Sequence, residues 1–111
     1  MKRNATPQDS FKDFVLDQLS QVQDLRSRAM FGGHGLYAGA HFFGILHQAR
    51  LYFRTNATTR PAYEQRGMKP FAPSARQTMN YHEVPADVIE HAVELVAWAQ
   101  QAISISHDQS S

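Results

Sequence analysis

Three glycines within four positions, Gly32, Gly33 and Gly35, stand where the hydrophobic pattern of the chain changes. Before them, apolar residues recur at three- and four-residue spacing, which predicts a first helix that ends near residues 23–25. From residue 27 to residue 53 the pattern becomes a series of short extended runs, typical of three or four antiparallel strands joined by short loops. The glycines therefore predict a turn or bulge inside a β-meander, with positive φ and close approach of neighbouring backbone.

The rest of the chain continues with alternating element types. A short helix is predicted for residues 58–67, an extended segment for residues 78–84, and a long helix from Pro85 to about Ile103 that gives way to a polar tail. The element order is then α-β-β-β-(β)-α-β-α. This order predicts an α+β fold in two layers, with an antiparallel sheet of four to five strands packed with helices on one side.

Length and composition set further bounds. The chain of 111 residues is long enough for one core, so residues 1–111 are expected to form a single domain with an ordered core over about residues 7–104. The formal net charge is only +1, which weighs against non-specific binding of nucleic acid. The absence of cysteine excludes disulfides, thiolate metal sites and a cysteine nucleophile.

No segment has the pattern of a membrane span or a secretion signal. Polar residues follow the opening Met-Lys-Arg, where the apolar core of a signal peptide would lie. No apolar run approaches the roughly 18 residues that a membrane-spanning helix needs. We therefore expect a cytoplasmic protein without membrane contact.

The glycine cluster does not fit a phosphate-binding loop. Such a loop needs a strand, a glycine motif and then a helix, because the N–H groups at the helix N-terminus bind the anion. Here Gly33-His34-Gly35 is followed by an apolar extended run, and no Gly-Lys-Ser/Thr occurs. The sequence thus predicts no nucleotide cofactor, and no other cofactor is expected.

The histidines and carboxylates also favour structural roles. His41 and His47 share strand parity, but six residues of extended chain separate them by about 20 Å, too far to hold one metal ion. Asp87, Glu90 and Glu94 are best explained as a solvated helix face near the positive end of the helix dipole. No serine is framed by a plausible base. We predict no metal site, no catalytic residue and no enzymatic activity.

Several segments together resemble one family. In order along the chain, they are RAMFGGHGLY, RLYFR, TRPAYEQRG, MNYHEVPADVIE and LVAWA. They resemble the signature of the TfoX/Sxy N-terminal domain family, whose proteins are bacterial competence regulators, with Arg54 where the family has a strand lysine. The resemblance covers about residues 11–102, and it implies a two-layer α/β domain like the secretion-chaperone fold.

The resemblance also implies a function. It points to a non-enzymatic regulatory or adaptor domain that acts through protein–protein contacts with the transcription machinery, with a regulator of the cyclic-AMP receptor protein type as the candidate partner. Full-length Sxy proteins carry a second, helix-rich C-terminal domain, and the present sequence is expected to correspond to the N-terminal domain alone.

Candidate interaction residues cluster around the glycine motif and the later strands. Arginine and tyrosine are favoured at binding hot spots, which singles out Arg28, Tyr37 and Arg54. The glycines Gly32, Gly33 and Gly35 would set the turn. The full candidate surface consists of Arg28, Met30, Phe31, Tyr37, Tyr52, Arg54 and Tyr81. Core packing is the alternative for Met30, Phe31 and Tyr52.

Two other functions and one assembly stay open. Five arginines are candidates for a shared sheet face or end with Tyr37 and Tyr52, an arrangement that can hold single-stranded nucleic acid. These arginines are Arg26, Arg28, Arg50, Arg54 and Arg60. The second alternative is a small-ligand sensor. The last helix has apolar residues over about 220° of its circumference, wider than one sheet face covers, so a homodimer is also predicted.

Overall fold

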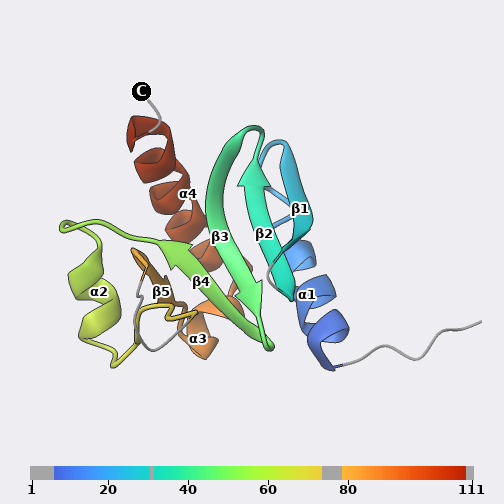
Figure 1. Ribbon diagram of the computed structural model, residues 1–111, viewed down its shortest axis with the longest axis horizontal. Helices are drawn as coiled ribbons and strands as arrows, with labels where there is room; N and C mark the ends of the chain where they lie inside the picture. The colour runs from blue at the N-terminus through green and yellow to red at the C-terminus, as the bar shows by residue number, and fades with distance from the viewer. Residues whose placement is uncertain (1–6, 31, 74–78, 110–111) are drawn as a thin grey trace, which may run out of the picture.

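The computed structural model describes residues 7–30, 32–73 and 79–109. The elements are α1 (Pro7–Gln18), β1 (Leu25–Met30), β2 (Gly33–Ala38), β3 (His41–His47), β4 (Arg50–Arg54), α2 (Arg60–Glu64), β5 (Tyr81–Glu83), α3 (Ala86–Ile89) and α4 (Ala92–Gln109). Figure 1 shows a single sheet crossed by α4 and flanked by α1. The predicted α+β class and the predicted element order are confirmed.

The sheet is a meander in which each strand pairs with the next. The five strands lie in the order β1-β2-β3-β4-β5, and all pairs are antiparallel. Short turns explain the pairing of β2 with β3 and of β3 with β4, because a tight turn brings the next strand back beside the one before it. β5 differs, since it pairs with β4 after a long connection that contains α2. The β3–β4 turn has positive φ at Gln48 (52°) and Ala49 (58°), as a tight hairpin of this twist requires.

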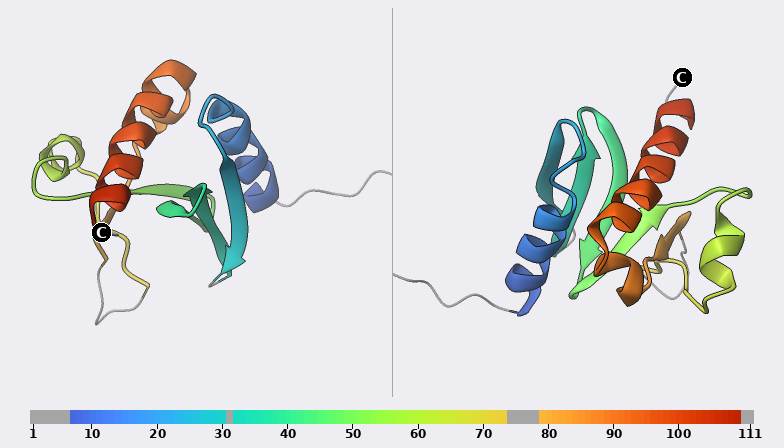
Figure 2. Two further views of the ribbon diagram at one scale, coloured as in Figure 1. Left: turned by 90° about the horizontal axis from the view of Figure 1, so that it is seen from above. Right: turned by 180° about the vertical axis from the view of Figure 1, so that it is seen from behind.

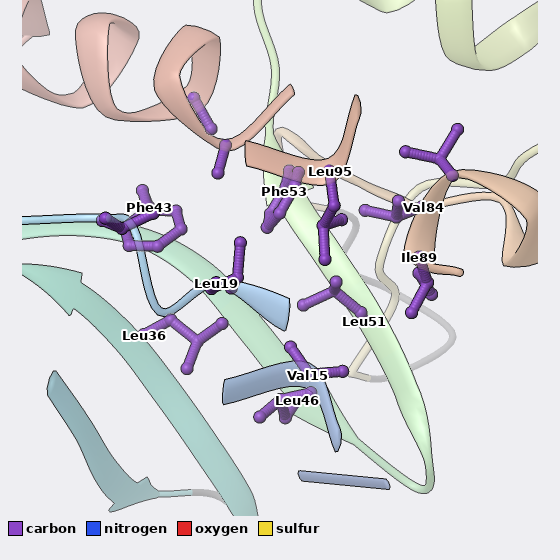
Figure 3. Close-up of a cluster of buried hydrophobic side chains, with 14 of the residues drawn as sticks. Val15, Leu19, Leu36, Phe43, Leu46, Leu51, Phe53, Val84, Ile89 and Leu95 are labelled. Atoms are coloured by element: carbon purple, nitrogen blue, oxygen red, sulfur yellow. The ribbon is translucent and has the colours of Figure 1, made fainter. Parts of the chain in front are cut away.

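Helices α1 and α4 cover the same face of the sheet, as the view from behind in Figure 2 shows. Strand side chains alternate between the two faces, and one set packs against these helices. Figure 3 shows this core, in which Leu36 and Phe53 of the sheet pack together with residues of the helical layer. These residues are Val15 of α1, Leu19 of the turn that follows α1, and Leu95 of α4. Each of these five side chains is fully buried.

The first helix ends earlier than predicted. α1 stops at Gln18 rather than near residues 23–25. The apolar spacing continues past its end because Leu19 and Val22 are buried from a turn instead of from a helix. Phe14, which belongs to the same apolar stripe, is 44% exposed.

The predicted last helix is two helices, and the break has a side-chain cause. Between α3 and α4, the Gln18 side-chain amide donates to the Ile89 carbonyl at 2.9 Å. The His91 Nδ1 lies 2.7 Å from the Asp87 carbonyl oxygen, while the His91 N–H bonds to Val88 in a tighter turn. These contacts occupy carbonyls that an uninterrupted helix would use for its own N–H groups.

The C-terminal end is helical where a polar tail was predicted. α4 continues to Gln109, with Ile105 and Ser106 buried. The Ser106 hydroxyl donates to the Phe42 carbonyl of β3. A polar side chain therefore anchors this turn to the sheet, which hydropathy alone does not indicate.

Much of the wide apolar arc of the last helix is covered within the chain. Leu95 is buried in the core, and Val96 is half-buried against it. Trp98 contacts the Tyr63 ring at 4.8 Å between ring centroids and lies under the Arg66 guanidinium at 5.5 Å. Val93 stays 87% exposed. In the described part of the chain, no helix combines the length and apolarity needed to cross a membrane.

Candidate functional site: the open face of the sheet

The face of the sheet that points away from α1 and α4 carries most of the candidate residues. Residues directly opposite each other in antiparallel strands share a face, so the register defines it. One row runs from Arg28 through Gly35, Ile45 and Tyr52 to Glu83. Neighbouring rows place further side chains on the same side. We call this the open face, formed by Arg26, Arg28, Met30, Gly33, Gly35, Tyr37, Phe42, Ile45, His47, Arg50, Tyr52, Arg54, Tyr81 and Glu83.

The register brings together candidate residues that are distant in sequence. Arg28, Met30 and Tyr37 of the first hairpin lie on the open face with Tyr52 and Arg54 of β4. Tyr81 joins them because it pairs with Arg54. Phe31 lies outside the described residues. Of the five arginines considered for one face, only Arg60 is separate, since it lies in α2.

A β-bulge aligns three aromatic rings on this face. The β2–β3 register shifts after Leu36, which leaves Phe43 as the extra residue of β3. The shift sets Phe42 opposite Tyr37, with their rings stacked at 5.1 Å. The Phe42 ring lies 5.5 Å from the Tyr81 ring on its other side. Sequence reasoning missed Phe42, because the apolar run of β3 has no alternation that separates its two faces.

Tyr81 is the fixed end of this aromatic row. The residue is buried, its hydroxyl donates to the Phe42 carbonyl at 3.4 Å, and Arg54 Nη1 donates to that hydroxyl at 3.3 Å. The Arg54 guanidinium also lies 5.7 Å from the ring centroid. Burial raises the pKa of Tyr81, and Arg54 opposes this rise. Tyr81 therefore fixes the position of the Phe42 ring through buried contacts, and it offers little surface to a partner.

The loop before β5 covers one half of the open face. Phe71 is buried and packs on Tyr52 at 4.9 Å and on His47 at 5.5 Å between ring centroids. The Phe71 N–H donates to the Tyr81 carbonyl at 2.7 Å and the Met79 N–H donates to the Phe71 carbonyl at 2.9 Å, and these bonds hold Phe71 in place. Burial, followed by the charge of Glu83, raises the pKa of the half-buried Tyr52. The more accessible half is therefore the one formed by β1 and β2, with Arg26 and Arg28 exposed beside Tyr37.

The three glycines have separate roles. Gly32 lies in the β1–β2 turn with φ 73°, a conformation that favours glycine. Gly33 and Gly35 lie in β2. A Cβ on Gly33 would overlap the Leu46 carbonyl oxygen, and one on Gly35 would lie 2.9 Å from side-chain carbons of Met30 and Phe42. Gly35 thus leaves the space into which Met30 packs against the aromatic row.

The open face is basic. The five strands contain four arginines and a single acidic residue, Glu83. Glu83 pairs with Arg50, whose Nη1 lies 3.1 Å from each carboxylate oxygen. The excess positive charge therefore gathers toward the exposed Arg26 and Arg28. Such a surface can bind an acidic protein segment or a phosphate backbone.

Among the side chains that the structure describes, the other titratable groups form no comparable site. On the helix-covered side, His82 Nδ1 lies 3.0 Å from Thr55 Oγ1, both side chains are buried, and burial lowers the pKa of His82. Asp87 pairs with Arg66 at 2.9 Å, and this hydrogen bond lowers the pKa of Asp87. Among the described residues, no three histidine, aspartate or glutamate side chains gather where they could hold a metal ion.

Comparison with known protein families gives a match to this chain. Residues 17–106 match the family model of the TfoX N-terminal domain. The match spans most of the chain and confirms the resemblance noted from the sequence segments. A search of curated proteins gave no match.

Proposed function

The chain belongs to the TfoX N-terminal domain family, and from this premise we propose that it is a non-enzymatic regulatory or adaptor domain. It acts in the cytoplasm by protein–protein contact with the transcription machinery. The candidate partner is a regulator of the cyclic-AMP receptor protein type. The family is of a regulatory type, which supports the proposal at the level of class.

One observation carries the proposal: exposed arginines lie beside a row of aromatic rings on a sheet face that none of the described helices covers. Arg26 and Arg28 are exposed, and Tyr37 and Phe42 are half-buried. Arginine and tyrosine dominate binding hot spots, because both present large contact areas together with hydrogen-bond donors. The aromatic row is held by the buried Tyr81, so a partner would meet a pre-ordered surface, which lowers the entropic cost of binding.

Affinity capture tests this function. The tagged protein is used to capture partners from a lysate of its own source cells, with and without nuclease, and co-purified proteins are identified by mass. We expect a transcription protein that survives nuclease treatment. Arg28→Ala and Tyr37→Ala should release it, whereas Arg60→Ala, which removes an arginine outside the open face, should retain it. If Arg60→Ala released the partner while Arg28→Ala and Tyr37→Ala retained it, the partner would bind outside the open face.

A second candidate function is direct binding of single-stranded nucleic acid. The observation that favours it is the sharing of one face by four arginines and by Tyr37 and Tyr52, since bases stack on aromatic rings while arginines contact phosphates. Affinity for a labelled oligonucleotide should then fall steeply as salt rises from about 50 to about 200 mM. Loss of all captured proteins on nuclease treatment, together with this salt dependence, would favour nucleic acid over a protein partner.

The proposal includes self-association through α4. Val93 is 87% exposed and lines a groove of about 390 Å³ between α1 and α4, together with Ala92 and Val96. An exposed valine beside a half-buried one is a small apolar patch that a second copy can cover.

A further inference from the structure

The first strand is an open edge of the sheet. β1 begins the five-strand order and pairs with β2 on one side, and Figure 1 shows it as the outermost strand. The other edge is protected, because the Glu83 N–H donates to the Lys69 carbonyl at 3.0 Å and Pro70 bridges to His82. Within the described part of the chain, β1 is therefore the edge that still offers backbone groups for pairing.

The register shows which groups of β1 face outward. Hydrogen-bonded and non-hydrogen-bonded pairs alternate along an antiparallel ladder. Met30 pairs with Gly33 at one end of the β1–β2 ladder, and at the other end the Gly39 N–H donates to the Asp24 carbonyl at 2.9 Å. The even-numbered residues of this strand therefore bond to β2. The residues whose N–H and C=O groups point to the free edge are Leu25, Ser27 and Ala29.

The side chains along this edge determine which charge a partner strand must carry. Arg26 and Arg28 flank Ser27, lie on the open face and are exposed. If two copies of β1 paired antiparallel about Ser27, Arg26 of each copy would lie opposite Arg28 of the other. Like charges directly opposite each other destabilise a strand pair. The edge thus disfavours a second copy of itself and favours a strand with acidic residues at alternate positions.

We propose that β1 is a docking edge for an extended acidic segment of a partner protein, which adds to the sheet as a sixth strand. The inference rests on the proposed adaptor function and names the chemistry of its partner. Main-chain bonds to Leu25, Ser27 and Ala29 supply affinity, as in other strand additions. Acidic side chains two positions apart lie opposite Arg26 and Arg28 and supply specificity.

The test uses labelled peptides of about nine residues in which glutamate alternates with threonine. A matched peptide carries lysine in place of glutamate. Binding is followed by fluorescence anisotropy, and amide hydrogen exchange is measured on the wild-type protein. We expect the glutamate peptide to bind, the lysine peptide to fail, and exchange to slow at the amides of Leu25, Ser27 and Ala29. Absence of binding, equal binding of both peptides, or binding without this protection overturns the proposal.

A backbone variant separates edge pairing from contact through side chains. Ser27→Pro removes an outward N–H without removing a bond to β2, and proline is tolerated at such edge positions. This variant should bind the glutamate peptide about tenfold more weakly than the wild type does. The affinity of Ser27→Ala for the same peptide should stay within about twofold of the wild-type value. In the lysate capture, a partner that is lost with Tyr37→Ala but retained by Ser27→Pro overturns the edge inference alone. If no nuclease-resistant partner is captured at all, the adaptor function itself fails.

Discussion

The two faces of the sheet are built from the same strands but differ in burial and in residue type. The helix-covered face presents Leu36, Leu51 and Phe53, all fully buried. The open face presents arginines and half-buried aromatic rings, with Phe71 covering only its β3–β5 half. Apolar burial is non-directional and holds the fold together, whereas charged and aromatic groups at a surface decide what binds. Side-chain parity therefore separates the residues that stabilise the fold from those that we propose for partner binding.

The five residues of strand β4 alternate between the two faces of the sheet. Leu51 and Phe53 point to the helices, and Arg50, Tyr52 and Arg54 point to the open face. A shift of register by one residue would exchange the two sets. Neighbouring positions in this strand therefore give the sharpest tests of the comparison.

The largest effect is expected for Phe53→Ala. Phe53 is fully buried and packs on Phe43 at 5.8 Å between ring centroids, so its truncation should lower the free energy of unfolding by about 3–5 kcal/mol. Tyr52→Ala, one residue away on the open face, removes a half-buried ring and should cost about 1–2 kcal/mol. Urea denaturation of both variants and the wild type gives the loss in free energy of unfolding for each substitution. Equal losses of stability would show that side chains in the covered half of the open face stabilise the fold as much as those on the helix-covered face.

Two glycines of β2 extend the comparison to the backbone. An added Cβ at Gly33 meets the Leu46 carbonyl, and backbone cannot move aside without breaking the ladder, so Gly33→Ala should cost about 2–3 kcal/mol. At Gly35 the added Cβ meets the ends of Met30 and Phe42, which can rotate, and about 1 kcal/mol is expected. Thermal unfolding ranks the two variants. A larger loss for Gly35→Ala would mean that the aromatic row of the open face is rigidly packed.

Local patterns were enough to predict the fold class and the element order. The periodicity of strand residues such as Leu51 and Phe53, and the turn residues between runs, depend on near neighbours only. The break before Ala92 depends only in part on near neighbours, because the His91 contact with the Asp87 carbonyl is local but the Gln18 bond to the Ile89 carbonyl spans 71 residues. The helical end at Ser106 likewise depends on a contact with β3. Such partners cannot be read from a window of sequence.

The candidate site was predictable in its residue types and less so in its arrangement. Arginines and tyrosines on strands could be named, and the register places Arg28 and Tyr37 on one face with Tyr52. The bulge at Phe43, which aligns Phe42 with the other rings, leaves no local signature in an unbroken apolar run. Phe71 reaches the face from a loop, and its role depends on tertiary packing.

A pH effect is expected from the one titratable residue buried on the helix-covered side of the strands, among those that the structure describes. Burial lowers the pKa of His82 below 6.5, so the folded state binds fewer protons than the unfolded state in this range. The stabilisation from neutral His82 is therefore present above about pH 6.5 and is lost as the pH falls toward the lowered value. Urea denaturation from about pH 8 to about pH 5 should show this loss in the wild type. In His82→Gln, which keeps a hydrogen-bonding group near Thr55, the slope should be shallower, and an unchanged slope would assign the effect to other groups.

The smallest effect on stability is expected outside both faces, at Val93. Because Val93 is 87% exposed, Val93→Asp should change the free energy of unfolding by no more than about 0.5 kcal/mol. The same variant should abolish self-association, since a carboxylate placed in the groove between α1 and α4 must lose its hydration when a second copy covers it. Sedimentation of the wild type and the variant at micromolar concentration separates the two effects. A wild type that is monomeric over this range would contradict self-association through α4, and the open face and its edge would then be the two surfaces that we still propose for binding.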